Sequence, residues 1–265
     1  MHERSNSIES RPWTWSMGRI AGIPTGVHAS FLLLLAWVAY TAISSGGSLA
    51  AVMVSLVFTL TIFASVLLHE FGHALVARSF GIETESITLY PLGGVARLSG
   101  TPGTPRAGLW VALAGPAVNI VLAAAGLVLQ IGLGWMGTPA LITSFVGAFI
   151  YANVGLALFN MLPAFPMDGG RVLRAALQRK RGLLEATEIA VKIGKGFAVV
   201  FGIAGLVYNP MLLLIAPFVW FAADRELAHV RRLAAMAAEV LRRRKWVDAH
   251  MMDRDPSVHR GWMRR

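Results

Sequence analysis

The stretch "SVLLHEFGHALVAR", residues 65–78, places three ionisable side chains, His69, Glu70 and His73, inside an apolar segment. It ends a long uncharged run, because no Asp, Glu, Lys or Arg occurs from residue 20 to residue 68. Ionisable groups in a membrane-spanning segment are costly and by default mark a functional site. The stretch therefore predicts a membrane helix that carries chemistry.

Charged residues are few and unevenly distributed along the chain. They make up 14% of the 265 residues, whereas a soluble domain has about 25%. Two further uncharged runs, residues 107–167 and 196–223, each exceed the roughly 20 apolar residues that cross a bilayer. Buried helices of a soluble protein would show polar faces, and these runs show none. We therefore expect an all-α polytopic membrane protein.

Turn residues divide the uncharged runs into about six transmembrane helices. We expect them at residues 27–43, 49–80, 107–135, 140–165, 189–207 and 211–223. The segment "ESITLYPLGGVARLSG", residues 85–100, alternates apolar and polar positions around a Gly-Gly pair and predicts a small β-hairpin on the cytoplasmic side. Residues 1–19 are expected to form a cytoplasmic segment, 20–225 the transmembrane domain, and 226–265 a basic amphipathic helix with the start of a further domain.

Charge asymmetry between the loops predicts the orientation. The loops "SSGGS", "MGTP" and "YNP" carry no charge, and arginines cluster on the other side, which the positive-inside rule places in the cytoplasm with both termini. Residues 225–265 hold 11 Arg or Lys against 5 Asp or Glu. We expect this basic flank to lie beside anionic lipid and not to bind nucleic acid. The first apolar run is too long for a cleavable signal peptide.

His69 and His73 lie four residues apart and so share one face of a helix, where two imidazoles can hold one Zn²⁺. Glu70 is then placed to act as general base. Catalytic zinc takes three protein ligands, and we expect Asp168, in "NMLPAFPMDGGR", as the third, because it reaches a similar depth on the same side. The alternatives are His28, Glu83, Glu85, Glu185, Glu188, His229, His250 and His259.

Two motifs together resemble the site-2 protease family of intramembrane zinc metalloproteases. They are "HEFGH", residues 69–73, and "NMLPAFPMDG", residues 160–169, which matches N-x-x-P-x-x-P-x-D-G at every fixed position. "AGPAVN", residues 114–119, and "YPLGG", residues 90–94, resemble further features of the family. The resemblance covers residues 20–225. It implies a prokaryotic inner-membrane enzyme that cleaves membrane-protein substrates in or near their transmembrane segments.

The resemblance also implies a role for individual residues. His69, His73 and Asp168 would bind one zinc ion, Glu70 would be the catalytic base, and Asn160 would hold the substrate backbone or the oxyanion. The implied substrate contacts are Gly93, Gly94, Asn119 and Asn160. A transmembrane substrate must unwind before its carbonyls can be attacked, and an edge of the predicted hairpin could receive it as an added strand.

The C-terminal segment "WVDAHMMDRDPSVH", residues 246–259, resembles the opening of a cystathionine-β-synthase-type regulatory domain. Adenine nucleotide is an expected partner only if the natural protein carries the full domain. Three further functions stay open: a metal-ion or proton transporter, an inactive scaffold, and a zincin-type protease with Glu185 or Glu188 as third ligand. The intact Glu70 argues against the scaffold, and charges clustered at one site argue against the transporter.

Overall fold

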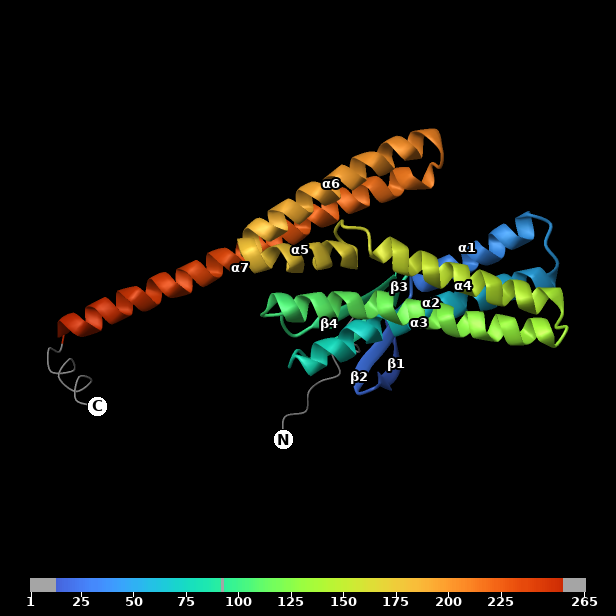
Figure 1. Cartoon of the computed structure of the whole chain (residues 1–265), viewed down its shortest axis with the longest axis horizontal. Helices are drawn as coiled ribbons and strands as arrows, with labels where there is room; N and C mark the ends of the chain where they lie inside the picture. Colours follow the sequence, from blue (N-terminus) through green and yellow to red (C-terminus); the bar gives the residue numbers. More distant parts are fainter. Residues whose placement is uncertain (1–12, 92, 255–265) are drawn as a thin grey trace. The chain divides into compact units, whose positions relative to one another are not determined.

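The computed structural model describes residues 13–91 and 93–254, which form a mostly helical chain with one small sheet (Figure 1). The elements are β1 (Thr14–Ile20), β2 (Ile23–His28), α1 (Phe31–Ser44), α2 (Leu49–Ser79), β3 (Thr84–Tyr90), β4 (Gly93–Leu98), α3 (Pro105–Trp135), α4 (Ala140–Asn160), α5 (Asp168–Arg181), α6 (Leu183–Val207) and α7 (Met211–Arg254). The chain divides into two compact units, residues 13–163 with 167–179 and residues 164–166 with 180–254. This division differs from the predicted boundary near residue 225.

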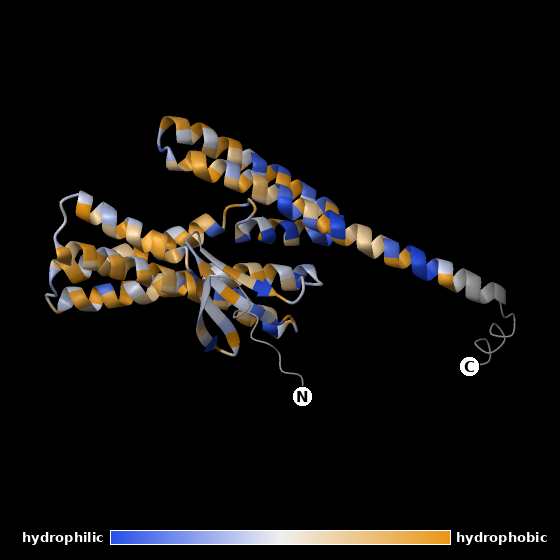
Figure 2. Cartoon of the chain, turned by 180° about the vertical axis from the view of Figure 1, so that it is seen from behind, coloured by the Kyte–Doolittle hydropathy of each residue, from blue (hydrophilic) through white to orange (hydrophobic). Residues whose placement is uncertain are grey.

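Among the described residues, α2, α3, α4 and α6 are long and apolar enough to cross a membrane, and α1 is a shorter apolar helix. Their surfaces are largely hydrophobic (Figure 2). On α3, for example, Leu127, Val128 and Ile131 are all exposed, as lipid-facing side chains are. The predicted helical membrane fold is confirmed, and the predicted spans 49–80 and 107–135 agree with α2 and α3 to within two residues.

The two longest spans begin at residues suited to helix capping. The hydroxyl of Ser48 accepts a hydrogen bond from the Ala51 amide at 3.3 Å, which starts α2. The hydroxyl of Thr104 accepts from the Ala107 amide at 3.2 Å, and Pro105 occupies the first helical position of α3. Such caps satisfy amide groups that have no partner within the helix.

The four strands form one sheet in the order β1-β2-β3-β4. The predicted hairpin is confirmed as β3 and β4, which pair antiparallel with Tyr90 opposite Gly93. The sheet is larger than predicted, because β1 and β2 form a second hairpin and β2 pairs parallel with β3, Thr25 opposite Ile87. The predicted first span, residues 27–43, was therefore wrong at its start: sheet pairing takes up the residues before α1.

The sheet packs on the C-terminal half of α2. Ile23 and Ile87 form a buried cluster with Phe71 and Ala74 of α2. This packing holds β3 and β4 beside the two turns of α2 that carry the histidine pair. The sheet thus positions a strand at the predicted site.

The region after α3 also differs in part from the prediction. Helix α4 ends at Asn160 rather than near residue 165, because Pro163 and Pro166 follow and proline disrupts a helix. An unpredicted amphipathic helix, α5, begins at Asp168 and carries basic residues on its exposed side.

In the second unit, α6 and α7 lie side by side (Figure 1). Lys195 of α6 forms an ion pair of 2.6 Å with Asp224 of α7 and lies 4.5 Å from the ring centroid of Trp220. The predicted sixth span, residues 211–223, is the start of α7, and the predicted basic helix is its continuation. The predicted opening of a regulatory domain falls on the end of α7 and on residues 255–265, which lie outside the described residues.

Candidate metal centre

The predicted histidine pair and the predicted aspartate converge in the first unit. His69 and His73 lie on adjacent turns of α2, and Asp168 is the first residue of α5. The Nε2 atoms of the two histidines are 3.1 Å apart, and each is 3.1 Å from Asp168 Oδ2. All three residues are buried. Among the described residues, these three side chains form the group that can hold a metal ion.

The spacing of the three atoms fits zinc. Bonds of about 2.0–2.1 Å in a tetrahedron place neighbouring ligand atoms roughly 3.3 Å apart. Two imidazoles and one carboxylate are a donor set that zinc takes in catalytic sites, with the fourth position left for water or substrate. The geometry of this protein therefore meets the first requirement of a catalytic zinc site.

The other nitrogen of each ring is held by α3. His73 Nδ1 lies 2.7 Å from the carbonyl oxygen of Val111, and His69 Nδ1 lies 2.6 Å from Asn119 Oδ1. A carbonyl oxygen can only accept, so Nδ1 of His73 carries the proton and its Nε2 is left to bind a cation. Hydrogen bonds of this kind orient metal-ligating histidines and raise their basicity.

Helix α3 approaches the histidines closely because it has a glycine there. A Cβ atom built on Gly115 would overlap the Nε2 atoms of both His69 and His73. One turn away from His69, Gly72 of α2 faces the backbone of α3, where a Cβ would lie only 2.7 Å from the carbonyl oxygen of Ala114. The two helices thus meet at their smallest residues beside the metal-binding atoms.

Asp168 begins a helix, and its second carboxylate oxygen has a cationic neighbour. Arg171 Nη1 lies 3.7 Å from Asp168 Oδ1. Burial raises the pKa of the Asp168 carboxyl, and the positive charge of Arg171 lowers it and favours the ionised form. An ionised carboxylate supplies the negative charge that a cation site needs.

Glu70 follows the first histidine and meets the sheet. A Cβ atom on Gly94, the second residue of β4, would overlap the Cγ atom of Glu70. The side chain of the predicted base is thus in contact with the backbone of the strand at the end of the sheet. Glu70 therefore lies next to β4, an outer strand of the sheet, to which an extended peptide could add by backbone hydrogen bonds.

The remaining predicted site residues lie in different surroundings. Asn160 ends α4, and its amide donates to the Leu156 carbonyl at 3.0 Å. Asn119 is fully buried and hydrogen-bonded at both ends of its amide. Gly93 starts β4 opposite Tyr90. Their roles as substrate contacts stay predictions.

Three of the side chains considered as a third ligand have partners of their own. The ring of His28, at the end of β2, stacks on Tyr90 with centroids 5.0 Å apart. Glu185 pairs with Arg181, and Glu188 pairs with Arg231, at 2.6 and 2.8 Å.

The other alternative third ligands are acidic residues around β3 and histidines of the C-terminal region. Glu85 is exposed on β3, Glu83 precedes that strand, and His229 lies on α7. The His250 side chain and His259 fall outside the described part of the chain.

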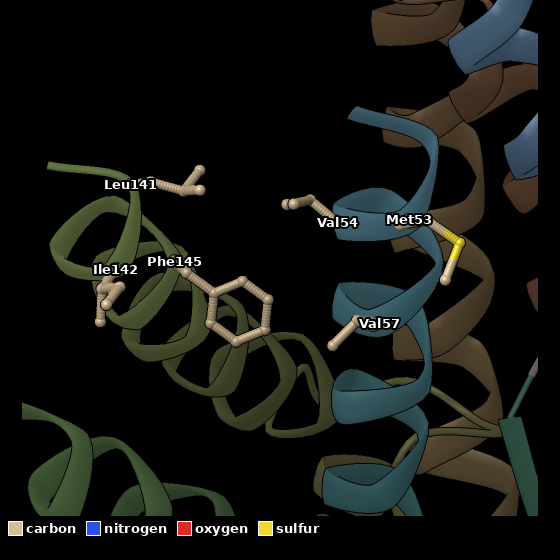
Figure 3. Close-up of a pocket in the computed structure, with 6 residues that line it drawn as sticks. All are labelled: Met53, Val54, Val57, Leu141, Ile142 and Phe145. Carbon is tan, nitrogen blue, oxygen red and sulfur yellow. The ribbon is translucent and has the colours of Figure 1, made fainter. Parts of the chain in front are cut away.

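An apolar pocket of about 330 Å³ lies between α2 and α4, well away from this group (Figure 3). Its lining residues are Met53, Val54, Val57, Leu141, Ile142 and Phe145. Val57 precedes His69 by twelve residues, or about 18 Å along a helix. The pocket has no polar side chain and is not the site of the chemistry.

Comparison with known proteins agrees with the geometry. Two stretches of the chain, residues 57–137 and 136–201, match the model of peptidase family M50. The chain belongs to peptidase family M50. The matched stretches include the histidine pair, the α3 segment that holds it, and Asp168.

Several named proteins are similar to this chain over half of its length or more. Zinc metalloprotease MJ0392 of Methanocaldococcus jannaschii is 38% identical over 214 residues, which are 78% of this chain and 59% of that protein. The solved structure of a site-2 protease from M. jannaschii aligns with a TM-score of 0.59 at 34% identity, over 81% of this chain and 95% of that one. Stage IV sporulation protein FB of Bacillus subtilis is 28% identical over 139 residues, 52% of this chain and 46% of that protein. The chain thus spans about three fifths of the first of these relatives.

Sequence reasoning missed three features of the site: the Val111 carbonyl, Gly115 and Arg171. The motif "AGPAVN" was a signal for Gly115, but its function was not evident without the facing helix. Arg171 is one of the arginines that the charge asymmetry places on the cytoplasmic side, and nothing in the sequence indicates its contact with Asp168.

Proposed function

We propose that this chain is an intramembrane zinc metalloprotease that hydrolyses peptide bonds in or near the transmembrane segments of membrane proteins. The observation that carries the proposal is the convergence of His69, His73 and Asp168 at 3.1 Å from one another, with Glu70 next to the first histidine. Family membership supports the same reaction.

His69, His73 and Asp168 are the zinc ligands in this proposal, and Glu70 is the general base. A zinc ion held by these residues would act as a Lewis acid toward the scissile carbonyl and make water a stronger nucleophile. Glu70 takes a proton from the attacking water and gives it to the leaving nitrogen of the peptide. Asn160, at the end of α4, is proposed to hold the substrate backbone or the developing oxyanion.

The substrate is proposed to enter as an extended strand. A transmembrane helix hides its carbonyls in its own hydrogen bonds and must unwind before attack. Strand β4 ends the sheet order, so it offers an edge for a further strand. Because Gly94 contacts Glu70, a peptide along this edge would pass close to the base. Gly93, Gly94 and Asn119 keep the substrate-contact roles implied by the family resemblance.

We also propose that the protein is multi-pass in a prokaryotic inner membrane with both termini in the cytoplasm. The support is the charge difference between the loops. Cysteine labelling tests it directly, because the chain has no cysteine of its own. A cysteine at Ser45, in the loop after α1, should react with an impermeant reagent in intact cells. Reaction only after permeabilisation would reverse the orientation.

Replacing Glu70 by Gln tests the chemistry. The change keeps the size of the side chain and removes the base, so zinc content should stay at the wild-type level while cleavage falls by about 10²–10⁴-fold. Purified protein would be reconstituted with single-span substrates and the products followed on gels. Glu85→Gln, the same change at an exposed position of β3, is the matched control and should cleave normally. Normal cleavage by Glu70→Gln would refute the mechanism.

A further inference from the structure

A line of buried polar side chains continues outward from the proposed zinc site through three helices. His69 of α2 contacts Asn119 of α3, and the Asn119 amide nitrogen donates to Asn153 Oδ1 of α4 at 2.9 Å. Both asparagines have 0% exposure. Burying an amide in an apolar environment costs free energy unless the group is hydrogen-bonded. The line therefore requires both hydrogen bonds, and the reaction proposed above assigns no role to Asn153.

The orientation of the Asn153 side-chain amide, at the outer end of this line, is fixed by its hydrogen bonds. Asn153 Nδ2 donates to the backbone carbonyl of Phe149 at 3.0 Å. A carbonyl oxygen has no hydrogen to give, so this end of the Asn153 amide must be its NH₂ group. Its oxygen therefore faces Asn119 and accepts from the Asn119 NH₂ group, as observed.

The same reasoning continues to the histidine. Because the NH₂ group of Asn119 is committed to Asn153, its oxygen faces His69. A ring nitrogen that faces an oxygen acceptor must carry the hydrogen, so Nδ1 of His69 is the donor at 2.6 Å. Nε2, which faces His73 and Asp168, is then free of that hydrogen and can bind a metal ion.

We propose that Asn153 is a positioning residue that fixes the tautomer of His69 through Asn119. Without Asn153, the Asn119 amide could turn over and present its NH₂ group to the ring. Nδ1 would then accept, the hydrogen would move to Nε2, and a metal ion would have to displace it. This inference rests on the proposed zinc site and adds to it a residue that contacts neither the metal-binding atoms nor the His69 ring.

Zinc affinity of the full chain in detergent tests the inference. Zn²⁺ would be titrated into metal-free protein against a chromophoric chelator, and the absorption spectrum of the Co²⁺-loaded protein would report the ligand geometry. Asn153→Leu keeps the approximate shape and removes the hydrogen bonds to Asn119, Phe149 and Ser65. Its zinc affinity should fall by about 10–100-fold, as for loss of partners outside the ligand shell. Asn153→Asp, protonated in its buried position so that one oxygen donates to the Phe149 carbonyl, keeps an acceptor for Asn119, and its affinity should stay close to wild type.

A double variant separates positioning from packing. In Asn119→Asp/Asn153→Leu, both oxygens of the carboxylate can only accept, so His69 Nδ1 must donate whichever way the carboxylate turns. Zinc affinity and the Co²⁺ spectrum should therefore return toward wild type. Asn119→Asp alone is the reference, because its carboxylate also raises the basicity of the His69 ring. If Asn153 acts only by packing, Asn153→Leu will lower zinc affinity by the same factor in the Asn119→Asp background as in wild type, and the inference is overturned.

Ser65→Ala is the matched control. The Ser65 hydroxyl lies 3.3 Å from Asn153 Nδ2, but the Phe149 carbonyl still fixes the amide, so zinc affinity should not change. Thermal melting of the metal-free variants would establish that each is folded, and Asn153→Ala would replace the Leu variant if that one does not fold. Unchanged affinity in the folded variant would overturn the inference, whereas a wild-type protein without zinc would instead overturn the proposed function.

Discussion

Replacing Gly115 by Ala should close the metal site while leaving the fold intact. The added methyl carbon would lie 2.5 Å from His69 Nε2 and even closer to His73 Nε2. Ordinary contact begins near 3.4 Å, so the His69 ring would have to retreat by about 0.9 Å. Both nitrogens are proposed zinc ligands, so the methyl group would crowd the space that a metal ion needs.

The effects on stability and on metal binding should differ in size. Alanine is favoured over glycine in a helix interior by about 1 kcal/mol, and overpacking typically costs about 1–3 kcal/mol. The unfolding free energy should therefore change by at most about 2 kcal/mol. A displacement of about 1 Å at a catalytic group costs on the order of 10²-fold, and we expect a loss of at least that size in cleavage, with a large loss of zinc.

Gly108→Ala is the matched control on the same helix. The nearest atom to its new methyl group would be Ala175 Cβ at 3.6 Å, which is ordinary contact. This variant should keep its zinc and melt at a slightly higher temperature. Mass spectrometry would give the zinc content of both variants, and circular dichroism their melting. Wild-type zinc content in Gly115→Ala would show that the metal is not bound where the two histidines face α3.

Two further predictions concern the ligands and the sheet edge. Asp168→Ala should lose bound zinc, whereas Glu185→Ala, which only breaks an exposed ion pair, should keep it; the reverse result would identify Glu185 as the third ligand. Gly94→Val should push β4 away from Glu70, so that zinc content is unchanged and cleavage falls steeply; normal cleavage would exclude β4 from the path of the substrate.

The long membrane helices could be predicted because their signals are local. Uncharged runs longer than a bilayer requires are visible in the sequence, and the ends of α2 and α3 coincide with turn and capping residues. Strand β2 could not be recognised in the same way. Its apolar residues continue into α1, and a short apolar run is compatible with either strand or helix. What makes it a strand is the pairing of Thr25 with Ile87, more than sixty positions away.

The same distinction, between features with a local signal in the sequence and features without one, applies to the site. The histidine spacing and the aspartate motif identify candidate ligands, because metal chemistry restricts the residue types. The residues that hold those ligands in place are not restricted to particular types. Val111 contributes only its backbone carbonyl, Gly115 contributes the absence of a side chain, and Asn153 acts from a third helix. None of these roles leaves a pattern in a single sequence.

The elements that form the proposed site contact one another at glycines. Helix α2 meets α3 at Gly72 and Gly115, β4 meets α2 at Gly94, and Gly169 lies against the backbone carbonyls of the residues that follow α4. Lipid tails are as apolar as the side chains they touch, so membrane helices associate through close packing and interhelical hydrogen bonds rather than through the hydrophobic effect. The contacts that bring α2, α3 and α4 together are therefore the same contacts that aim the imidazoles. A site built in this way gains rigid metal-binding atoms, and its tolerance to change should be lowest at glycines and asparagines that touch neither metal nor substrate.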